Sequence, residues 1–372
     1  MVPFTRRQAL LTCGAAAGAL LMPPIDQSAA ARSANSHVIA TKLDLAEQSG
    51  ALKNLHAVLV WRKGQLLAER YYSGPDESWG RDLGTVAFGP GTLHDLRSVT
   101  KSVVGLLYGI ALAEGKVPAL DTPLLDAFPE HKDLAKDPQR AAWTIGHVLS
   151  MAMGTTWNED LPYTDPRNSE IAMERAEDRV RFILEQPLEA DPGTRWDYNG
   201  GCSALIGALI SSATGGDLLA YARDVLFDPL AIPSSEWIQG QDKAYSAASG
   251  LRLSGPSLLR IGQLVLQGGQ WDGRQIVPSA WIEASKAAEI HTSWGMGYSR
   301  FWYGSEQSST GADGRVTGSH FTLGAMGNGG QRLWILPDLD LVVVTYSGLY
   351  NAPDQWINPT LILQRIILAN LD

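Results

Sequence analysis

The sequence predicts an α+β fold, in which an antiparallel sheet built from both chain ends is flanked by helices and carries an inserted, mainly helical lobe. Segments 56–72 and 331–348 each contain two β-rich runs around a turn signal, Lys63-Gly64 in the first and Pro337-Asp338 in the second, which is typical of antiparallel hairpins. Segments 104–115, 142–154, 175–186 and 202–216 place apolar residues at helical spacing. The lobe is therefore expected at roughly residues 110–235.

Composition and charge limit the possible functions. The chain has 372 residues, of which 45% are hydrophobic and 19% charged, and this is ordinary globular usage with enough apolar residues for a large core. The net charge is −9, and no run of five or more Lys or Arg occurs. Nucleic acid and anionic membranes are therefore poor partners, and a small molecule fits better.

The N-terminal segment has the order of an export signal. Arg6 and Arg7 precede an apolar stretch at 9–22, and small residues follow at 29–31. This order resembles a twin-arginine signal, and the apolar stretch is too short to span a bilayer. We expect residues 1–31 to be removed and a single domain, 32–372, to be periplasmic or secreted without a stable membrane span. An ordinary secretory signal or an uncleaved anchor is the alternative.

Ser98 and Lys101 form a Ser-x-x-Lys pair directly ahead of the apolar run 104–115, where a helix is predicted to start. Residues three apart share one helix face, so the Lys101 nitrogen can reach the Ser98 oxygen. The helix N-terminus adds positive potential that favours an oxyanion and a deprotonated nucleophile. The pair predicts a serine nucleophile with a lysine base, but a chain of this composition is expected to contain such a pair by chance.

Four blocks that include this pair carry a family resemblance. They read "RSVTKSVVGLL", "VLSMAMGTTWNED", "PGTRWDYNGGCSALIGALISSATGG" and "GNGGQRLWILPDLDLVVVTYSG". Their order and spacing resemble the superfamily of serine β-lactamases and penicillin-binding proteins. Within it they are similar to the class C-related branch, which includes family VIII esterases, D-amino-acid peptidases and 6-aminohexanoate-dimer hydrolases. The resemblance implies a β-lactamase/DD-peptidase-like fold and hydrolysis through an acyl-enzyme.

The same resemblance assigns catalytic roles. Ser98 matches the nucleophile, Lys101 its base or relay, and Tyr198 the tyrosine that passes the proton to the leaving group. The backbone N–H groups of Ser98 and Asn328 match the oxyanion hole, with Ala325 in place of Asn328 if the register is shifted. An adjacent ammonium is expected to move the Tyr198 phenol toward phenoxide. Whether Lys101 or Tyr198 is deprotonated at rest stays open.

Two motifs depart from the family pattern. Asn199 follows Tyr198 directly, whereas the pattern places one residue between the tyrosine and a substrate-binding asparagine. If Gly327 is the glycine of the third motif, Ala325 stands where the family has a cation that holds a substrate carboxylate. This departure argues against a β-lactam or D-alanyl substrate, and Asn199 and Gly327 are kept as expected substrate contacts.

Segment 155–168 is similar to the loop that forms one wall of the cleft in 6-aminohexanoate-dimer hydrolases. Its acidic side chains would favour a substrate with a free amine, and Tyr163 and Asp165 are expected to contact substrate. A solvated acidic loop is an equally good interpretation of the residues alone.

No competing catalytic motif is present in the sequence. It lacks Gly-x-Ser-x-Gly, His-Glu-x-x-His, paired Cys-x-x-Cys and a phosphate-binding loop, so neither cofactor nor metal is expected. The sequence therefore predicts an exported serine hydrolase of small esters or linear amides. The alternatives are a β-lactamase or D-alanyl-D-alanine carboxypeptidase, and a non-catalytic binding protein on the same fold.

Overall fold

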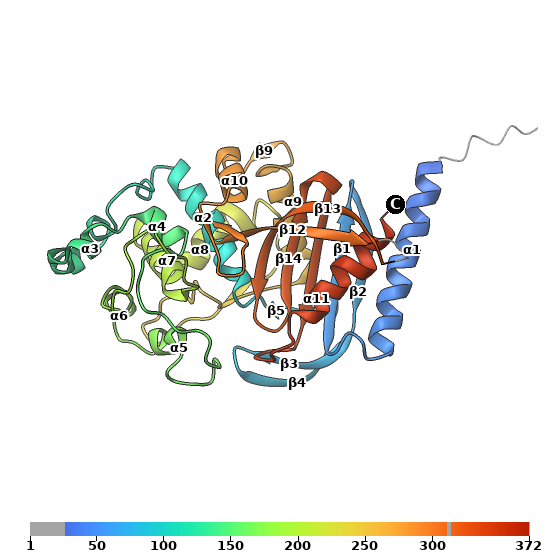
Figure 1. The fold of residues 1–372 in the computed structure, drawn as a ribbon, viewed down its shortest axis with the longest axis horizontal. Coiled ribbons are helices and arrows are strands. Elements are labelled where there is room, and N and C mark those ends of the chain that lie inside the picture. The colour runs from blue at the N-terminus through green and yellow to red at the C-terminus, as the bar shows by residue number, and fades with distance from the viewer. Residues whose placement is uncertain (1–26, 311–313, 372) are drawn as a thin grey trace, which may run out of the picture.

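The computed structural model describes residues 27–310 and 314–371 (Figure 1). Within these residues the main sheet is antiparallel and has the strand order β10-β11-β12-β13-β14-β15-β1-β2. Because β1 pairs with β15 on one side and β2 on the other, the two ends of the chain share one sheet, as predicted. The strand bounds are Ile290–His291 (β10), Gly297–Ser299 (β11), Trp302–Thr310 (β12), Val316–Gly327 (β13), Gln331–Leu336 (β14), Leu341–Ser347 (β15), Leu55–Arg62 (β1) and Gln65–Tyr71 (β2).

Both predicted hairpins are confirmed. Lys63 and Gly64 connect β1 to β2 with φ angles of 48° and 80°, which is the left-handed backbone that a two-residue hairpin turn requires. A short 3-10 turn at Pro337–Leu339 connects β14 to β15.

Helices cover both faces of the sheet (Figure 1). On one face lie α1 (Gln27–Gln48) and the C-terminal segments α11 (Ile357–Leu361), η5 (Ile362–Ile367) and η6 (Leu368–Asn370). On the other lie α2 (Val99–Ala113) and α9 (Gly255–Leu266). Alternate residues of β15 enter the two cores, with Val343 facing the first and Val344 the second, as the two-residue period of a strand requires.

The helical lobe follows α2 and is drawn in green in Figure 1. It contains η1 (Leu124–Asp126), η2 (Pro129–Lys136), α3 (Pro138–Ala141), α4 (Ile145–Leu149), α5 (Ser169–Glu174), α6 (Arg179–Leu184), α7 (Gly200–Ala213), α8 (Leu218–Ala222) and η3 (Arg223–Phe227). The smaller elements are β3 (Ser73–Ser78), β4 (Arg81–Ala87), β5 (His94–Asp95), β6 (Glu236–Trp237), β7 (Leu251–Leu253), β8 (Gln270–Trp271), β9 (Arg274–Gln275) and α10 (Ser279–Lys286).

One predicted helix is much shorter than its apolar pattern indicates. Of the segment 142–154, only Ile145–Leu149 is an α-helix. Met151 takes a left-handed φ of 54°, and the Trp143 indole donates a hydrogen bond to the Met153 carbonyl at 2.7 Å. The apolar residues after Leu149 are therefore part of a packed loop that lies in the core, not part of a helix.

The expected export signal, residues 1–31, lies mostly outside the described residues, and α1 begins within it at Gln27. Among the described residues, no single helix is long and apolar enough to cross a membrane. One bent pair, Gly200–Ala213 with Leu218–Phe227, meets the length and composition criteria together.

Candidate active site

Ser98 lies at the first turn of α2, three residues after the end of β5. The helix is buried from Val99 to Ala111, so packing on all sides fixes the position of its first turn. The Ser98 hydroxyl makes no capping hydrogen bond to the helix. Ser98 borders two cavities, of about 1020 Å³ and about 380 Å³, and its hydroxyl is therefore available where the two cavities meet.

Lys101 stands one turn further along the same face of α2. Its Nζ donates hydrogen bonds to Ser98 Oγ at 3.1 Å and to the Ala248 carbonyl at 2.9 Å. A Glu170 carboxylate oxygen lies 3.7 Å from the same nitrogen, and both side chains are almost fully buried. The predicted contact between Lys101 and Ser98 is present, and Ala248 and Glu170 hold the lysine in place to make it.

Tyr198 approaches the same point from the residues before α7. Its hydroxyl lies close enough to the Ser98 side chain to interact with it, and Lys101 Nζ lies 4.9 Å from the centre of its ring. Burial, followed by the charges of Glu159 and Glu170, raises the pKa of Tyr198 well above its ordinary value. The direction is opposite to the expected shift toward phenoxide, because burial disfavours the charged phenoxide and the nearby carboxylates add to this effect. The resting tyrosine is therefore a neutral phenol.

Two carboxylates, the half-buried Glu159 and the buried Glu170, complete a group that we call the catalytic cluster: Ser98, Lys101, Glu159, Glu170 and Tyr198. Glu159 accepts hydrogen bonds from Trp157 Nε1 and the Gly200 backbone N–H, both at 2.6 Å, and from the Tyr163 hydroxyl at 2.8 Å. Glu170 accepts a short hydrogen bond from the Ser249 hydroxyl. Burial, and then the Glu170 charge, raises the pKa of Glu159 to about 7. The sequence did not single out Glu170, because it lies far along the chain from Lys101.

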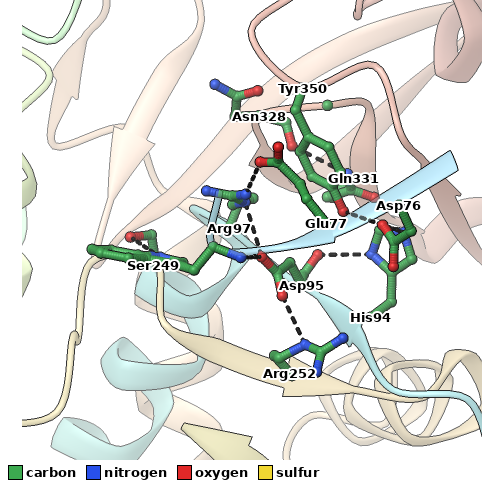
Figure 2. A network of polar contacts seen from close by, with 12 residues as sticks. Asp76, Glu77, His94, Asp95, Arg97, Ser249, Arg252, Asn328, Gln331 and Tyr350 are labelled. Atoms are coloured by element: carbon green, nitrogen blue, oxygen red, sulfur yellow. Dashed lines mark hydrogen bonds and ion pairs between the residues drawn. The ribbon is translucent and has the colours of Figure 1, made fainter. Parts of the chain in front are cut away.

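Arg97, the residue before Ser98, belongs to a second polar group, which we call the support cluster: Glu77, Asp95, Arg97, Arg252 and Tyr350 (Figure 2). Asp95 lies between two arginines, 3.2 Å from Arg97 Nε and 2.7 Å from Arg252 Nε. Glu77 pairs with Arg97 at 2.5 Å, and the Arg97 guanidinium lies 4.7 Å from the centre of the Tyr350 ring. These contacts hold Arg97 at a left-handed φ of 49°, which is unfavourable for a residue with a side chain.

The end of β13 lies directly against the start of α2. A Cβ at Gly327 would come within 2.4 Å of the Leu96 carbonyl oxygen, so only glycine permits this approach. Asn328, which follows, borders both cavities, and its side chain is tied to Asn351 by hydrogen bonds of 2.7 and 3.0 Å. Ala325, the alternative to Asn328 in a shifted register, is fully buried in the core.

A cation reaches the cleft from the neighbouring strand. Arg332 of β14 pairs with Met326 of β13 and borders the larger cavity. Its Nη1 donates to the carbonyl oxygens of Gly327 and Gln331 at 2.9 and 2.8 Å. Burial lowers the pKa of Arg332 to about 10. The motif pattern did not indicate this arginine, because the pairing of β14 with β13 brings it next to the third motif.

The other residues that were expected to contact substrate differ in whether they border the two cavities. Tyr163 borders both cavities. Asn199 does not, because its buried side chain caps α7 through the Cys202 backbone N–H and bonds Thr155. Asp165 does not border these cavities either, since its carboxylate pairs with Arg167 at 2.7 Å. A residue that caps a helix and one that pairs with an exposed neighbour both resemble binding residues in a sequence.

Comparisons with known proteins agree with this geometry. Residues 53–364 match the Beta-lactamase family model. The 6-aminohexanoate-dimer hydrolase of Paenarthrobacter ureafaciens is 26% identical over 335 residues, which cover 83% of this chain and 76% of that protein. The lovastatin esterase of Penicillium rubens is 28% identical over 122 residues, 31% of this chain and 29% of that protein.

A solved structure shows the same fold. The penicillin-binding protein homologue from Pyrococcus abyssi superposes with a TM-score of 0.65 at 16% identity, covering 87% of this chain and 76% of that one. The family match spans most of the chain, and the relatives are hydrolases. The chain therefore belongs to the beta-lactamase family, within the superfamily of serine β-lactamases and penicillin-binding proteins.

Proposed function

We propose that this protein is an exported serine hydrolase that cleaves small esters or linear amides through an acyl-enzyme on Ser98. The observation that carries the proposal is the contact between Lys101 Nζ and Ser98 Oγ, at 3.1 Å, at the point where two cavities meet. Export rests on the order of residues in the first 31 positions alone.

The catalytic cluster supports a complete proton path. Ser98 Oγ attacks the carbonyl carbon, and its proton enters the Lys101–Tyr198 pair while the neutral Tyr198 phenol gives a proton to the leaving group. Glu170 can hold the proton that the Lys101 ammonium must release before it acts as a base. The backbone N–H groups of Ser98 and Asn328 stabilise the oxyanion. Water then cleaves the ester to Ser98 and restores the hydroxyl.

The two cavities suggest an elongated substrate that crosses Ser98. Aromatic residues such as Trp157, Trp196 and Tyr303 line the larger cavity, and they suit an apolar chain. The smaller cavity has charged walls, including Glu77, Arg97 and Glu170. One relative is a hydrolase of 6-aminohexanoate dimers and another is an esterase, which agrees with a choice between amides and esters.

Arg332 favours a second candidate, a β-lactamase or D-alanyl-D-alanine carboxypeptidase. These substrates carry a carboxylate that needs a cation near the third motif. Arg332 borders the larger cavity, and its Nη1 is the guanidinium nitrogen that donates to carbonyls, those of Gly327 and Gln331, among the residues that the structure describes. The rest of the guanidinium is a fork of donors that matches a carboxylate. The substrate panel must therefore include a chromogenic cephalosporin.

The test measures p-nitrophenyl butyrate hydrolysis by the wild type, Ser98→Ala and Ser102→Ala. Ser102 is the matched control, because it is a buried serine of the same helix whose hydroxyl donates to the Phe301 carbonyl. Only Ser98→Ala should lose turnover, and its stability should change by at most about 1 kcal/mol because Ser98 makes no capping bond. Mass spectrometry of the quenched wild type should find a butyryl group on Ser98. Full activity in Ser98→Ala would overturn the assignment.

A further inference from the structure

Three buried side chains meet on the other side of the support cluster from the cleft: His56 of β1, Asp76 of β3 and His94 of β5. Their exposed fractions are 0%, 5% and 0%, and one ligand atom from each lies within 4.8 Å of the others. Figure 2 shows Asp76 and His94 close to Tyr350. None of the three takes part in the proposed hydrolysis.

The hydrogen bonds around the two imidazoles assign their ring protons. His56 Nε2 lies 3.0 Å from Asn54 Oδ1, and Asn54 Nδ2 donates to the Pro75 carbonyl, so Oδ1 accepts and His56 Nε2 carries the hydrogen. His94 Nδ1 lies 3.0 Å from the Asp95 carbonyl oxygen. Because a carbonyl oxygen only accepts, His94 Nδ1 carries the hydrogen there. In a neutral imidazole the other nitrogen then presents a lone pair.

These two lone pairs face each other. His56 Nδ1 and His94 Nε2 are 2.9 Å apart, and Asp76 Oδ1 lies 3.9 Å from the first and 3.7 Å from the second. Asp76 Oδ1 accepts a hydrogen bond from the Tyr350 hydroxyl at 2.9 Å, and Asp76 Oδ2 has no hydrogen-bond partner among the described residues. Electron pairs of three groups thus converge on one buried point, where a positive charge is needed.

That charge could be a proton or a metal ion. Metal-binding histidines usually donate their second ring N–H to a carbonyl or carboxylate, and here Asn54 and the Asp95 carbonyl accept them. Two imidazoles and one carboxylate are a donor set that suits Zn²⁺ and similar divalent ions.

We propose that His56, Asp76 and His94 form a site for one divalent transition-metal ion, with Zn²⁺ as the fitting probe. Ligand atoms of tetrahedral zinc are about 3.3 Å apart, given bonds of about 2.0–2.1 Å. The separations of 2.9, 3.7 and 3.9 Å lie on both sides of that spacing, so shifts of less than about 1 Å complete the three ligands. Asp76 Oδ2, Tyr350 or water can supply the fourth.

The position of the site indicates a structural role. It joins the main sheet to β3 and to β5, which leads into Ser98 within three residues. The Gly74 backbone packs closely against the site, since a Cβ there would lie 2.2 Å from Asn54 Oδ1 and 3.0 Å from His56 Nε2. Sequence patterns did not predict a metal because the three ligands come from separate strands with wide spacing. A bound ion would fasten these strands together ahead of the nucleophile.

The test uses the full chain, stripped of metal with a chelator, incubated with ZnCl₂ and desalted. Elemental analysis of the wild type should find one zinc per chain, and Co²⁺ in its place should give the visible absorption of a four-coordinate site. The melting temperature of the wild type should rise on adding zinc. A wild type that retains no zinc holds a proton between its imidazoles and overturns the proposal, whether or not the protein hydrolyses esters.

Variants show where the ion binds. Asp76→Asn and His94→Gln should lose the bound zinc and the rise in melting temperature. His320→Gln is the matched control, because it removes a histidine of β13 that pairs with Asp338, and it should keep both. Circular dichroism shows whether each variant is folded. Equal zinc content in His94→Gln and the wild type would place the metal elsewhere and would also overturn the proposal.

Discussion

The catalytic cluster and the support cluster meet at the start of α2, and they balance their buried charges differently. In the support cluster, Asp95 lies between Arg97 and Arg252, and each arginine has a further carboxylate partner, Glu77 or Glu236. In the catalytic cluster, one ammonium is accompanied by two carboxylates, and Glu170 stays 3.7 Å from Lys101 Nζ. Charges in close ion pairs hold a shape, whereas buried charges with perturbed pKa values and no close ion-pair partner are typical of a site where protons move.

The largest effect is expected from removing one hydroxyl of the catalytic cluster. Tyr198→Phe should lower kcat/KM for p-nitrophenyl butyrate by about 10²–10⁴-fold, because the leaving group loses its acid, while the melting temperature changes little. Tyr298→Phe is the control. The ring centre of Tyr298 lies 5.6 Å from that of Trp196, which also contacts Tyr198, but Tyr298 does not border the larger cavity. Similar losses in both variants would mean that aromatic packing, and not proton transfer, explains the effect.

Substitutions in the support cluster should mainly lower the free energy of unfolding. Asp95→Asn leaves two buried arginines without the charge between them and should lower the free energy of unfolding by about 3–5 kcal/mol, measured by urea denaturation. Asp126→Asn breaks an exposed pair with Lys132 and should cost less than about 1 kcal/mol. The folded Asp95→Asn protein should keep more of its kcat than Tyr198→Phe does. The reverse order of kcat values would show that the two clusters do not have separate tasks.

The difference between local and long-range contacts explains which parts of the fold and of the site could be predicted from the sequence. Ser98 and Lys101 are three residues apart, and the hairpins at β1–β2 and β14–β15 are local, so periodicity and motif spacing identify them. Glu170 and Arg332 reach the cleft only through the packing of the lobe and the pairing of strands, and no local pattern indicates either residue.

Errors in the sequence interpretation have the same origin. The apolar pattern of 142–154 records burial correctly, but it contains no sign of the left-handed Met151 that ends the helix. The phenoxide expected at Tyr198 followed from the lysine next to it. Its actual environment includes two carboxylates that become neighbours only in the folded protein.

The smallest effect tests whether placing Glu159 next to Glu170 in the catalytic cluster lowers the stability of the folded protein. The pKa of Glu159 is raised from 4.5 to about 7 by burial and then by Glu170. Between these values the folded state binds a proton that the unfolded state has released. The contribution of Glu159 to the free energy of unfolding is therefore complete below pH 4.5 and is lost as the pH rises through about 7.

Glu159→Gln cannot titrate, but its amide oxygen can still accept from Gly200 and Trp157. The free energy of unfolding of the wild type minus that of Glu159→Gln should therefore fall by roughly 1–3 kcal/mol between about pH 5 and pH 8. Glu174, whose pKa is also raised to about 7, is present in both proteins and cancels in the difference. Urea midpoints at the two pH values supply the measurement. A difference that does not change with pH would mean that Glu159 stays ionised in the folded protein, and its three hydrogen-bond donors would then outweigh its burial and the nearby Glu170 charge.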